Sequence, residues 1–345
     1  GDKYVGEFEQ GSKSGQGTYF YLSGDKYEGS IRGDDWSGEG AFTFANGDKY
    51  VGQFLENRFN GQGTFSWPDG SKYEGGWADG VKTGKGKKTW GPATMFAGDT
   101  YVGDFRNDKP NGKGTYPYAD GREYAGDFTD GMINGVGTFT ELDGSTYAGD
   151  WQLGKRHGQG TQTDSTGQIY TGDFKNDAFN GEGTFVFANS DTYVGSFTDG
   201  VKSGEGTLEY ANGDKYIGPF MDGMRSGTGT FTYSNGDQYV GGFKQNEQYG
   251  EGILSYANGD KYVGFFQAGK PNGRGRLELA ASGNVYEGTY KDGLFDGEGT
   301  YTFANGDTYV GMFENDMFNG EGTLDLVSSG NKYIGQYEDD LFQVQ

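Results

Sequence analysis

Bulky apolar residues and glycines alternate with polar residues along the whole chain. In residues 49–55, Tyr50, Gly52 and Phe54 occupy alternate positions, and Val51 and Gln53 lie between them. Successive side chains of a strand point to opposite faces of a sheet, so this alternation predicts a strand with one covered face. The same alternation recurs throughout the sequence, which predicts a protein built from strands.

A second alternating segment follows each of these strands. In the segment 61–67, Gly61, Gly63, Phe65 and Trp67 fall on one predicted face, and Thr64 falls on the other. Asn-Gly or Asp-Gly dipeptides separate one pair of strands from the next, at Asn46-Gly47, Asp69-Gly70, Asp120-Gly121, Asn212-Gly213, Asn258-Gly259 and Asn305-Gly306. These dipeptides tolerate positive φ and are the strongest short signal for a hairpin turn. Each unit is therefore predicted to be a β-hairpin in a continuous antiparallel meander.

The unit occurs fifteen times, and each copy is marked by a Tyr-x-Gly triplet. The tyrosines of the triplets are Tyr4, Tyr27, Tyr50, Tyr73, Tyr101, Tyr124, Tyr147, Tyr170, Tyr193, Tyr216, Tyr239, Tyr262, Tyr286, Tyr309 and Tyr333. Their spacing is 23 residues, except after Tyr73 (28 residues), Tyr262 (24) and Tyr309 (24). A fixed period of this size is typical of repeat architectures. We expect one repeat array over residues 1–345, with copies that start near residues 2, 25, 48, 71, 99, 122, 145, 168, 191, 214, 237, 260, 284, 307 and 331, the last of them incomplete.

Two further positions of the repeat identify its family. Two residues after the glycine of each triplet comes a bulky residue, which is aromatic in every copy except that of Ile31, and seven residues later comes Gly-x-Gly, as at Gly61 and Gly63. This pattern closely resembles the MORN (membrane occupation and recognition nexus) repeat, and the resemblance covers the whole chain. A basic-His element often precedes the Gly-x-Gly in that family. Here it occurs only at Arg156-His157, and several copies carry phenylalanine instead, at Phe59, Phe179, Phe295 and Phe318.

The glycines fall on the same predicted face as the aromatic rings. Glycine normally weakens a strand, so its recurrence there suggests that the rings lie over glycine backbones of neighbouring strands, where a Cβ would displace them. Packing of rings on backbone would then replace a second layer. The expected fold is all-β: an elongated single-layer antiparallel β-hairpin solenoid, or twisted rod-like ribbon, with an exposed second face rich in Thr and Val.

Composition excludes several classes of protein. Aromatic residues make up 17% of the chain and hydrophobic residues only 32%, so a conventional aliphatic core is not expected. The net charge of −22 argues against binding to nucleic acid or to an anionic membrane, because both need a basic surface. It favours solubility and basic partners. No apolar run is long enough to span a membrane, and no signal peptide is present.

The sequence offers little for catalysis. The chain has no Cys, which excludes disulfides, thiolate zinc sites and Cys nucleophiles. His157 is the single His, so His-centred triads and multi-His metal sites are excluded, and we expect it to be structural or solvent-facing. No Gly-x-Gly continues as a dinucleotide-binding motif. The aspartates recur in the turns, at Asp25, Asp48, Asp99, Asp214, Asp237, Asp260 and Asp307. We expect no enzymatic activity, no cofactor and no bound metal.

The favoured function is that of a scaffold or adaptor. A strip of exposed rings and glycines would form an apolar groove for a peptide or helix of a protein partner. The candidate groove residues are Tyr50, Phe54, Tyr73, Trp77, Tyr101, Phe105, Tyr193, Phe197, Tyr216, Phe220, Tyr239, Phe243, Tyr262, Phe266, Tyr309 and Phe313. The alternative interpretation is that these rings pack internally. The resemblance implies a cytoplasmic, cytoskeleton-associated role in a cilium, basal body or cortical structure, and a homodimer through the terminal repeats.

Two other functions stay open. The family name implies a peripheral membrane protein that binds phosphoinositides, and Lys82, Lys85, Lys87 and Lys88 are candidate contacts to an anionic lipid. A second small basic cluster is formed by Lys270, Arg274 and Arg276. Alternatively, the repeats are the targeting region of a larger enzyme. The sequence starts at a repeat boundary without Met, so we expect that part of the natural protein is missing.

Three irregularities interrupt the repeat. Extra residues after Lys88 predict either a bulged loop or a contact specific to a partner. The apolar stripe fails at Glu141, Gln162 and Asp164, which predicts a bend or weak joint. The last half-unit around Tyr333 is expected to leave an unpaired edge strand, which could pair with another chain.

Overall fold

A computed structural model describes residues 1–343, and every regular element in this part of the chain is a strand. The strands form two compact units. Unit 1 comprises residues 1–167 and 173–178, and unit 2 comprises residues 168–172 and 179–345. Strands β15 (Ile169–Lys175) and β16 (Ala178–Val186) contain residues of both units.

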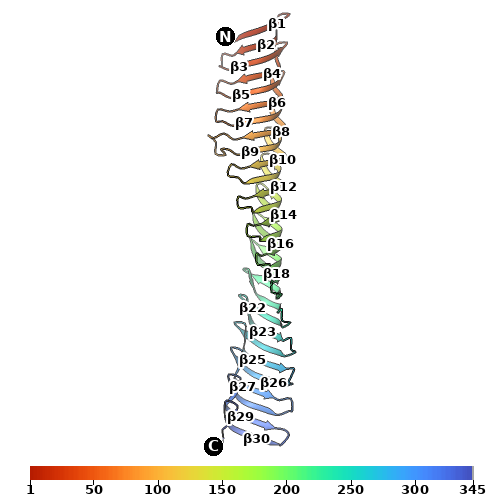
Figure 1. Cartoon of the computed structure of the whole chain (residues 1–345), viewed down its shortest axis with the longest axis vertical. Helices are drawn as coiled ribbons and strands as arrows, with labels where there is room; N and C mark the ends of the chain where they lie inside the picture. The colour runs from red at the N-terminus through yellow and green to blue at the C-terminus, as the bar shows by residue number, and fades with distance from the viewer. Residues whose placement is uncertain (344–345) are drawn as a thin grey trace. The chain divides into compact units, whose positions relative to one another are not determined.

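In unit 1, consecutive strands pair antiparallel in chain order (Figure 1). Their bounds are β1 (Lys3–Glu9), β2 (Ser12–Phe20), β3 (Lys26–Arg32), β4 (Asp35–Thr43), β5 (Lys49–Leu55), β6 (Arg58–Ser66), β7 (Lys72–Ala78), β8 (Val81–Thr89), β9 (Thr100–Arg106), β10 (Lys109–Pro117), β11 (Glu123–Thr129), β12 (Met132–Thr140), β13 (Thr146–Gln152) and β14 (Lys155–Thr163). Each pair of strands is one copy of the sequence repeat, as the alternating pattern predicts.

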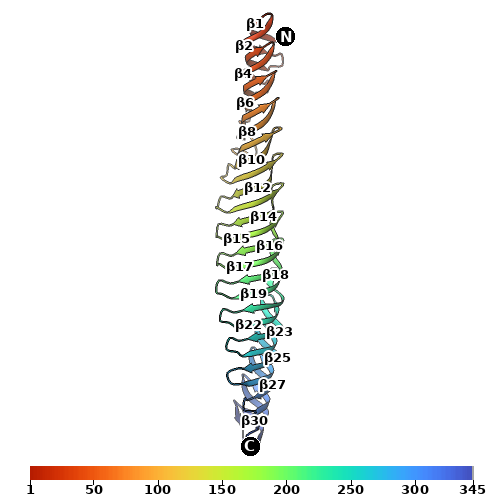
Figure 2. The same cartoon turned by 90° about the vertical axis from the view of Figure 1, so that its right-hand side faces the viewer.

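Unit 2 continues the same arrangement (Figure 2). Its strands are β17 (Thr192–Thr198), β18 (Val201–Glu209), β19 (Lys215–Met221), β20 (Met224–Arg225), β21 (Gly227–Thr232), β22 (Gln238–Lys244), β23 (Glu247–Ser255), β24 (Lys261–Gln267), β25 (Lys270–Leu279), β26 (Asn284–Lys291), β27 (Leu294–Thr302), β28 (Thr308–Glu314), β29 (Met317–Leu326), β30 (Asn331–Glu338) and β31 (Leu341–Phe342). The two-residue strand β31 pairs only with the end of β30, Tyr337 with Phe342 and Glu338 with Leu341. Among the described residues Tyr333 pairs only with Leu324 of β29, so the expected open edge at Tyr333 is confirmed.

The alternation within a strand sorts its side chains between two faces. In β5, Tyr50, Gly52 and Phe54 are buried, whereas Val51 and Gln53 are exposed. The predicted all-β antiparallel hairpin fold is therefore confirmed. We call the side that carries the buried rings the aromatic face, and the side of Val51 the opposite face.

A row of glycines runs through each unit at one register position. Gly52 of β5 pairs with Gly63 of β6, and Gly63 pairs with Gly75 of β7. The Tyr50 ring lies over this row, because a Cβ built on Gly63 would come within 2.3 Å of the Tyr50 hydroxyl oxygen. The predicted packing of rings on glycine backbone is thus confirmed, and it explains the second glycine of Gly-x-Gly.

The first glycine of Gly-x-Gly serves a β-bulge. The register between β5 and β6 shifts between Gly52 and Phe54, so the ladder to β6 skips Gln53. Gly61 has φ of 65° in the bulge, a left-handed conformation that a side chain would strain. The Tyr50 hydroxyl donates to the Gln53 carbonyl at 2.9 Å. The repeat therefore needs tyrosine rather than phenylalanine to satisfy the bulge.

Rings from its own repeat and from the next repeat enclose Tyr50. Tyr50 meets Phe54 of its own strand edge-on with ring centroids 5.1 Å apart, and Trp77 of the next repeat at 5.3 Å. Phe59 stacks on the other side of the ring at 3.9 Å and an interplanar angle of 14°. Such aromatic pairs contribute about 0.5–1.5 kcal/mol each beyond their buried area. A single sheet therefore buries Tyr50 completely without a second layer.

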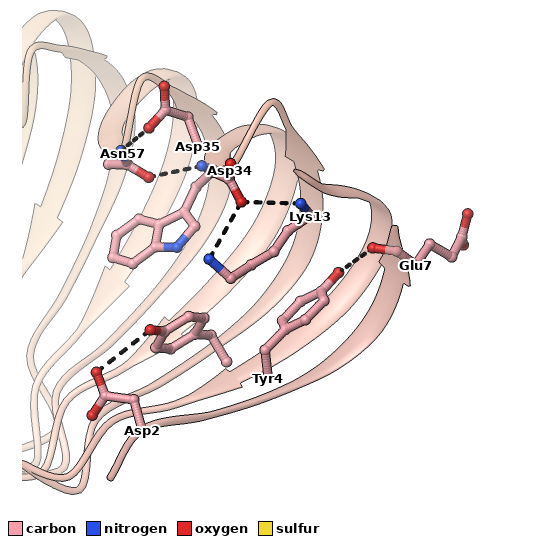
Figure 3. A network of polar contacts seen from close by, with 9 residues as sticks. Asp2, Tyr4, Glu7, Lys13, Asp34, Asp35 and Asn57 are labelled. Atoms are coloured by element: carbon pink, nitrogen blue, oxygen red, sulfur yellow. Dashed lines mark hydrogen bonds and ion pairs between the residues drawn. The ribbon is translucent and has the colours of Figure 1, made fainter. Parts of the chain in front are cut away.

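Turn carboxylates join each repeat to the next. Asp25 Oδ1 accepts the backbone N–H of Ala45 at 2.8 Å, twenty residues further on. Equivalent contacts in unit 2 run to Asp191, Asp214, Asp237, Asp260 and Asp307. At the other edge, Asp34 Oδ1 accepts the backbone N–H of Lys13 at 3.0 Å (Figure 3). The aspartates thus form turns, as predicted, and also fix the stacking of successive turns.

The irregular segments take defined conformations. Residues 91–98 form a loop that is closed by a hydrogen bond from Gly98 N to Trp90 O at 3.1 Å and that leaves Met95 89% exposed. Glu141 and Gln162 line a cavity of about 320 Å³ in unit 1, together with Trp151 and Arg156. The boundary of unit 1 lies at residues 167–178, in the repeat that follows Gln162.

Candidate functional site

The structure gathers the sixteen predicted groove rings into a row in each unit but buries them. Every one of them, from Tyr50 to Phe313, is at most 5% exposed. This agrees with the internal-packing interpretation, because the rings contact glycine backbone and one another. A partner on the aromatic face would therefore contact the side chains that lie over these rings.

These covering side chains form a second row. They come from the second position of the second strand of each repeat. This position lies opposite the bulky residue that follows the Tyr-x-Gly triplet, as Phe59 lies opposite Phe54. We call them the outer row. It consists of Lys13, Trp36, Phe59, Lys82, Pro110, Ile133 and Arg156 in unit 1, and Phe179, Lys202, Arg225, Gln248, Pro271, Phe295, Phe318 and Phe342 in unit 2.

The outer-row rings of Trp36, Phe59, Phe179, Phe295 and Phe318 stack on the tyrosine below, whereas Phe342 meets Tyr333 edge-on. The centroid distances are 3.9 Å for Phe59 on Tyr50 and 3.8 Å for Phe318 on Tyr309. Unlike the buried tyrosines, Phe59 and Phe318 remain partly exposed. Phe59 lines a hollow of about 320 Å³ with Trp36, Phe42, Phe44, Asn57, Arg58 and Gly80. This hollow is an apolar surface on the aromatic face of unit 1. The sequence does not reveal it, because Phe59 stands out there only as a departure from the family pattern.

Where the outer row is basic, the cation lies near the tyrosine ring instead. The Lys13 Nζ is 6.0 Å from the Tyr4 ring centroid, and the Lys82 Nζ is 5.6 Å from that of Tyr73. Lys13 is also held by Asp34 from the turn of the next repeat, with Nζ and Oδ1 3.4 Å apart (Figure 3). A cation over a ring is stabilised by the ring quadrupole, so these side chains fill the place of the stacked phenylalanine.

The four candidate lipid-binding lysines lie on two faces. Lys82 and Lys88 pair in register with Trp77 and Tyr73, on the aromatic face, whereas Lys87 pairs with Glu74 on the opposite face. Lys85 Nζ is bound by Asp104 at 2.8 Å. Burial, with a smaller contribution from Lys82, lowers the pKa of Lys88 to about 8. The four lysines therefore do not form one basic surface.

The opposite face carries a channel along the glycine row of unit 1. Its volume is about 1000 Å³, and its lining includes Gln62, Thr64, Glu74, Lys87 and Val102. Acidic, basic and β-branched side chains alternate along it. The strict alternation of strand residues could have located this channel from the sequence, since Glu74 and Val102 occupy the position between Tyr and Gly of their triplets.

Burial changes the chemistry of the tyrosines without giving them a reactive role. Desolvation by burial raises the pKa of Tyr73, Tyr193 and Tyr239 to about 12, so their hydroxyls stay protonated and serve as donors. His157 is partly buried and its Nδ1 makes no hydrogen bond to the described residues. Within residues 1–343, no group of three His, Cys, Asp or Glu side chains is arranged to hold a metal ion. In the same residues, no helix is long and apolar enough to cross a membrane.

Sequence comparison matches the chain to a family model described as the MORN repeat. Fourteen copies match, at residues 4–26, 27–49, 50–72, 73–92, 101–121, 124–146, 147–169, 170–192, 193–215, 216–238, 239–261, 262–281, 286–308 and 309–330. The fifteenth, incomplete copy that we predicted from residue 331 is not among them. No curated protein matches the chain in a search of their sequences.

Comparison with solved structures finds distant similarities. The SAS-4 (dCPAP) TCP domain of Drosophila melanogaster, in complex with a proline-rich motif of Ana2 (dSTIL), is 16% identical, with a TM-score of 0.29 over 46% of this chain and 85% of that chain. The TCP10 domain of Danio rerio CPAP is 9% identical, with a TM-score of 0.26 over 58% of this chain and 93% of that chain. Virginiamycin B lyase from Staphylococcus aureus is 10% identical, with a TM-score of 0.13 over 85% and 92%.

Proposed function

The chain belongs to the MORN repeat family, and from this premise we propose that it is a non-enzymatic scaffold that binds protein partners along its aromatic face. The supporting observation is the outer row. Its rings are partly exposed, whereas the tyrosines below them are buried by the fold itself. Aromatic side chains held rigidly at a surface are typical anchors of protein interfaces.

The geometry also favours a polypeptide over a small molecule. The hollow beside Phe59 is open and shallow, lined by rings from two adjacent repeats and by the polar side chains of Asn57 and Arg58. The same arrangement of stacked rings recurs at Phe295 and Phe318 in unit 2. A ligand that contacts several repeats must be extended, and repeat proteins commonly bind peptides or helices in this manner.

The family resemblance supports a location in the cytoskeleton, a cilium or a basal body. It also supports a homodimer of this chain, which fits the same scaffold role. A peripheral membrane function has less support. The lysines proposed to contact lipid lie on both faces, and two of them are paired with carboxylates, Lys82 with Asp108 and Lys85 with Asp104. The net charge of −22 also opposes approach to an anionic membrane.

Peptide selection on the intact chain tests the proposal. Random twelve-residue peptides are displayed, selected on the immobilised protein and titrated against variants. Phe59→Ser and Phe318→Ser remove outer-row rings, and the matched controls Val51→Ser and Val310→Ser remove exposed residues of the opposite face. We expect the selected peptides to lose affinity with the ring variants only. Failure to select any peptide, or loss with the valine variants only, would overturn the proposal.

A further inference from the structure

Five outer-row positions carry a basic residue. The turn of the next repeat provides a carboxylate for three of them and none for the other two. For three of them the turn supplies a carboxylate: Asp34 faces Lys13, Asp108 faces Lys82 and Asp177 faces Arg156, each with nitrogen and oxygen 3.4 Å apart. The remaining two, Lys202 and Arg225, belong to adjacent repeats of unit 2. Neither forms an ion pair with any residue of the described chain.

Arg156 and Arg225 form a matched comparison. Each donates its backbone N–H to the turn side chain of the next repeat, at 2.9 Å to Asp177 Oδ1 and at 2.8 Å to Asn246 Oδ1. Each also donates from Nη2 to the backbone carbonyl of that same turn residue. The hydrogen bonds are alike, but the turn residue is an aspartate next to Arg156 and an asparagine next to Arg225. The charge of Arg225 is therefore not neutralised where that of Arg156 is.

The turn that faces Lys202 also lacks a carboxylate, but for a different reason. The backbone N–H of Asp108 donates to the Lys82 carbonyl at 3.2 Å, and that of Gly223 donates to the Lys202 carbonyl at 3.0 Å. Gly223 thus occupies the turn position equivalent to that of Asp108, and as a glycine it offers no carboxylate. The Lys202 Nζ lies among three rings, 5.4 Å from the centroid of Phe187, 5.5 Å from Tyr193 and 5.3 Å from Phe220.

The two cations lie close together on the aromatic face. Arg225 pairs in register with Phe220, the same ring that the Lys202 ammonium approaches. The guanidinium carbon of Arg225 is 5.0 Å from the ring centroid of Phe231, and its Nε is buried without a hydrogen-bond partner among the described residues. Two positive charges with partly apolar surroundings repel each other and lack the solvation of exposed ions, so an anion between them would be stabilised.

Two acidic side chains of turns in the same part of unit 2, Asp191 and Asp214, already have hydrogen-bond partners. Asp191 accepts the backbone N–H of Ala211 at 2.8 Å and the side chain of Asn189 at 3.0 Å. Asp214 does the same with Ser234 at 2.8 Å and Asn212 at 3.0 Å. These contacts hold both carboxylates in the turns.

We propose that Lys202 and Arg225 bind a carboxylate side chain of a protein partner, set among apolar residues that contact the partly exposed Phe187. The chain itself supplies the template, because Asp34, Asp108 and Asp177 place a carboxylate against this position in three other repeats. An aspartate or glutamate of the partner takes their place. This inference rests on the proposed function and specifies the chemistry of the partner, an acidic and apolar segment.

The experiment repeats the peptide selection on the Phe59→Ser/Phe318→Ser protein, which keeps Lys202 and Arg225, and uses the peptide that is retained best. It is labelled and titrated by fluorescence anisotropy, both as selected and with every Asp and Glu replaced by Asn and Gln. The receptor variants are Lys202→Gln/Arg225→Gln, which removes the cations, and Gly223→Asp/Asn246→Asp, which keeps the cations and restores the internal carboxylates. Gly223 has φ of 78°, close to the 67° of Asp108, and a Cβ there would lie 3.5 Å from Val201, so aspartate fits.

We expect the amide peptide and both receptor variants to weaken binding by about tenfold, which corresponds to about 1.4 kcal/mol. The matched control Lys215→Gln/Lys261→Gln removes two charges from the opposite face of unit 2 and should leave the affinity unchanged. Circular dichroism confirms that each variant is folded. If removal of the cations unfolds the protein, the Gly223→Asp/Asn246→Asp variant still tests whether the unpaired cations bind the peptide.

Three results would overturn the inference. If the peptide binds the variants and the wild type equally well, the cations are not its site, although the proposed function stands. If no peptide is selected on either protein, the proposed function and this inference fail together. If vesicles that contain phosphatidylinositol phosphates bind the wild type and are released by the Gly223→Asp/Asn246→Asp variant, the anion at this site is a lipid phosphate and not a carboxylate.

Discussion

The phenol ring of Tyr50 lies directly over the α-carbon of Gly63 on the adjacent strand. A Cβ on Gly63 would come within 2.3 Å of the hydroxyl oxygen and 2.5 Å of two ring carbons. The same relationship recurs in both units, for example between Tyr239 and Gly252, where the nearest ring carbon would be 2.5 Å away. The repeat is therefore held by a ring on a bare backbone, and the glycine is as necessary as the tyrosine.

Gly63→Ala should destabilise the third repeat. The added methyl group must displace a fully buried ring, and overpacking of this kind typically costs about 1–3 kcal/mol. Hydrogen exchange of the amides in β5 and β6 measures the local loss of stability, because unfolding in a repeat protein need not be two-state. The control Thr64→Ala changes the opposite face of the same strand and should have a smaller effect. Equal effects of the two substitutions would argue against the ring-on-glycine contact.

Tyr50→Phe should also be destabilising, although the ring is kept. It removes the donor to the Gln53 carbonyl, which the bulge leaves without a partner in β6. An unsatisfied carbonyl in a partly buried position costs about 1–3 kcal/mol. Phe59→Tyr offers a control, since it adds a hydroxyl to the outer row without removing a bond. Unchanged exchange rates in β5 of Tyr50→Phe would show that water satisfies the carbonyl.

Alkaline pH should unfold the protein as the buried tyrosines ionise. Burial raises the pKa of Tyr73, Tyr193, Tyr216 and Tyr239 from 10.0 to about 12. The folded state therefore favours the neutral phenol, and the unfolded chain releases these protons first. The contribution to stability is complete below pH 10 and is lost as the pH rises from 10 to 12. Phenolate absorbance and circular dichroism should change together in this range. Ionisation of all tyrosines near pH 10 in a folded protein would contradict the burial.

Much of this architecture follows from local periodicity. The spacing of Tyr50, Gly52 and Phe54 predicts the strand, its covered face and the ring-on-glycine contact, because each depends only on alternation and on the absence of a Cβ. The role of Asp25 does not follow in the same way. Its carboxylate forms a local turn but also binds Ala45 twenty residues later, which depends on how successive turns stack.

The candidate site likewise combines features that local alternation predicts with features that it does not. Aromatic positions such as Tyr50 were recognisable as one stripe, but whether a ring faces a partner depends on what covers it. Phe59 covers Tyr50, and this depends on the bulge at Gly61, whose effect on register the pattern does not reveal. The division of the four lysines between two faces, in contrast, can be predicted from the sequence. Lys85 and Lys87 are an odd number of residues from Lys82, and strict alternation would have separated them.

The turn contacts make a further prediction, for which the chain provides its own control. Asp25→Ala removes the 2.8 Å bond to the Ala45 amide, whereas at the next turn the equivalent position is Pro68, which has no N–H to donate to Asp48. Asp25→Ala should therefore cost about 1 kcal/mol more than Asp48→Ala. Hydrogen exchange in the flanking strands measures the difference. Equal losses would mean that the carboxylates act only within their own turns.

Site-specific photo-crosslinking tests the central claim that the partly exposed outer row of the aromatic face binds a polypeptide. A benzophenone amino acid is placed at Phe59 or Phe318 on the aromatic face, and at Val51 or Val310 on the opposite face, and each protein is irradiated with the selected peptide. The buried tyrosines stay intact in all four variants. Crosslinks from Phe59 and Phe318, with none from the valine positions, are the predicted result. Crosslinks from Val51 and Val310 alone would place the partner in the channel of the opposite face and contradict the account.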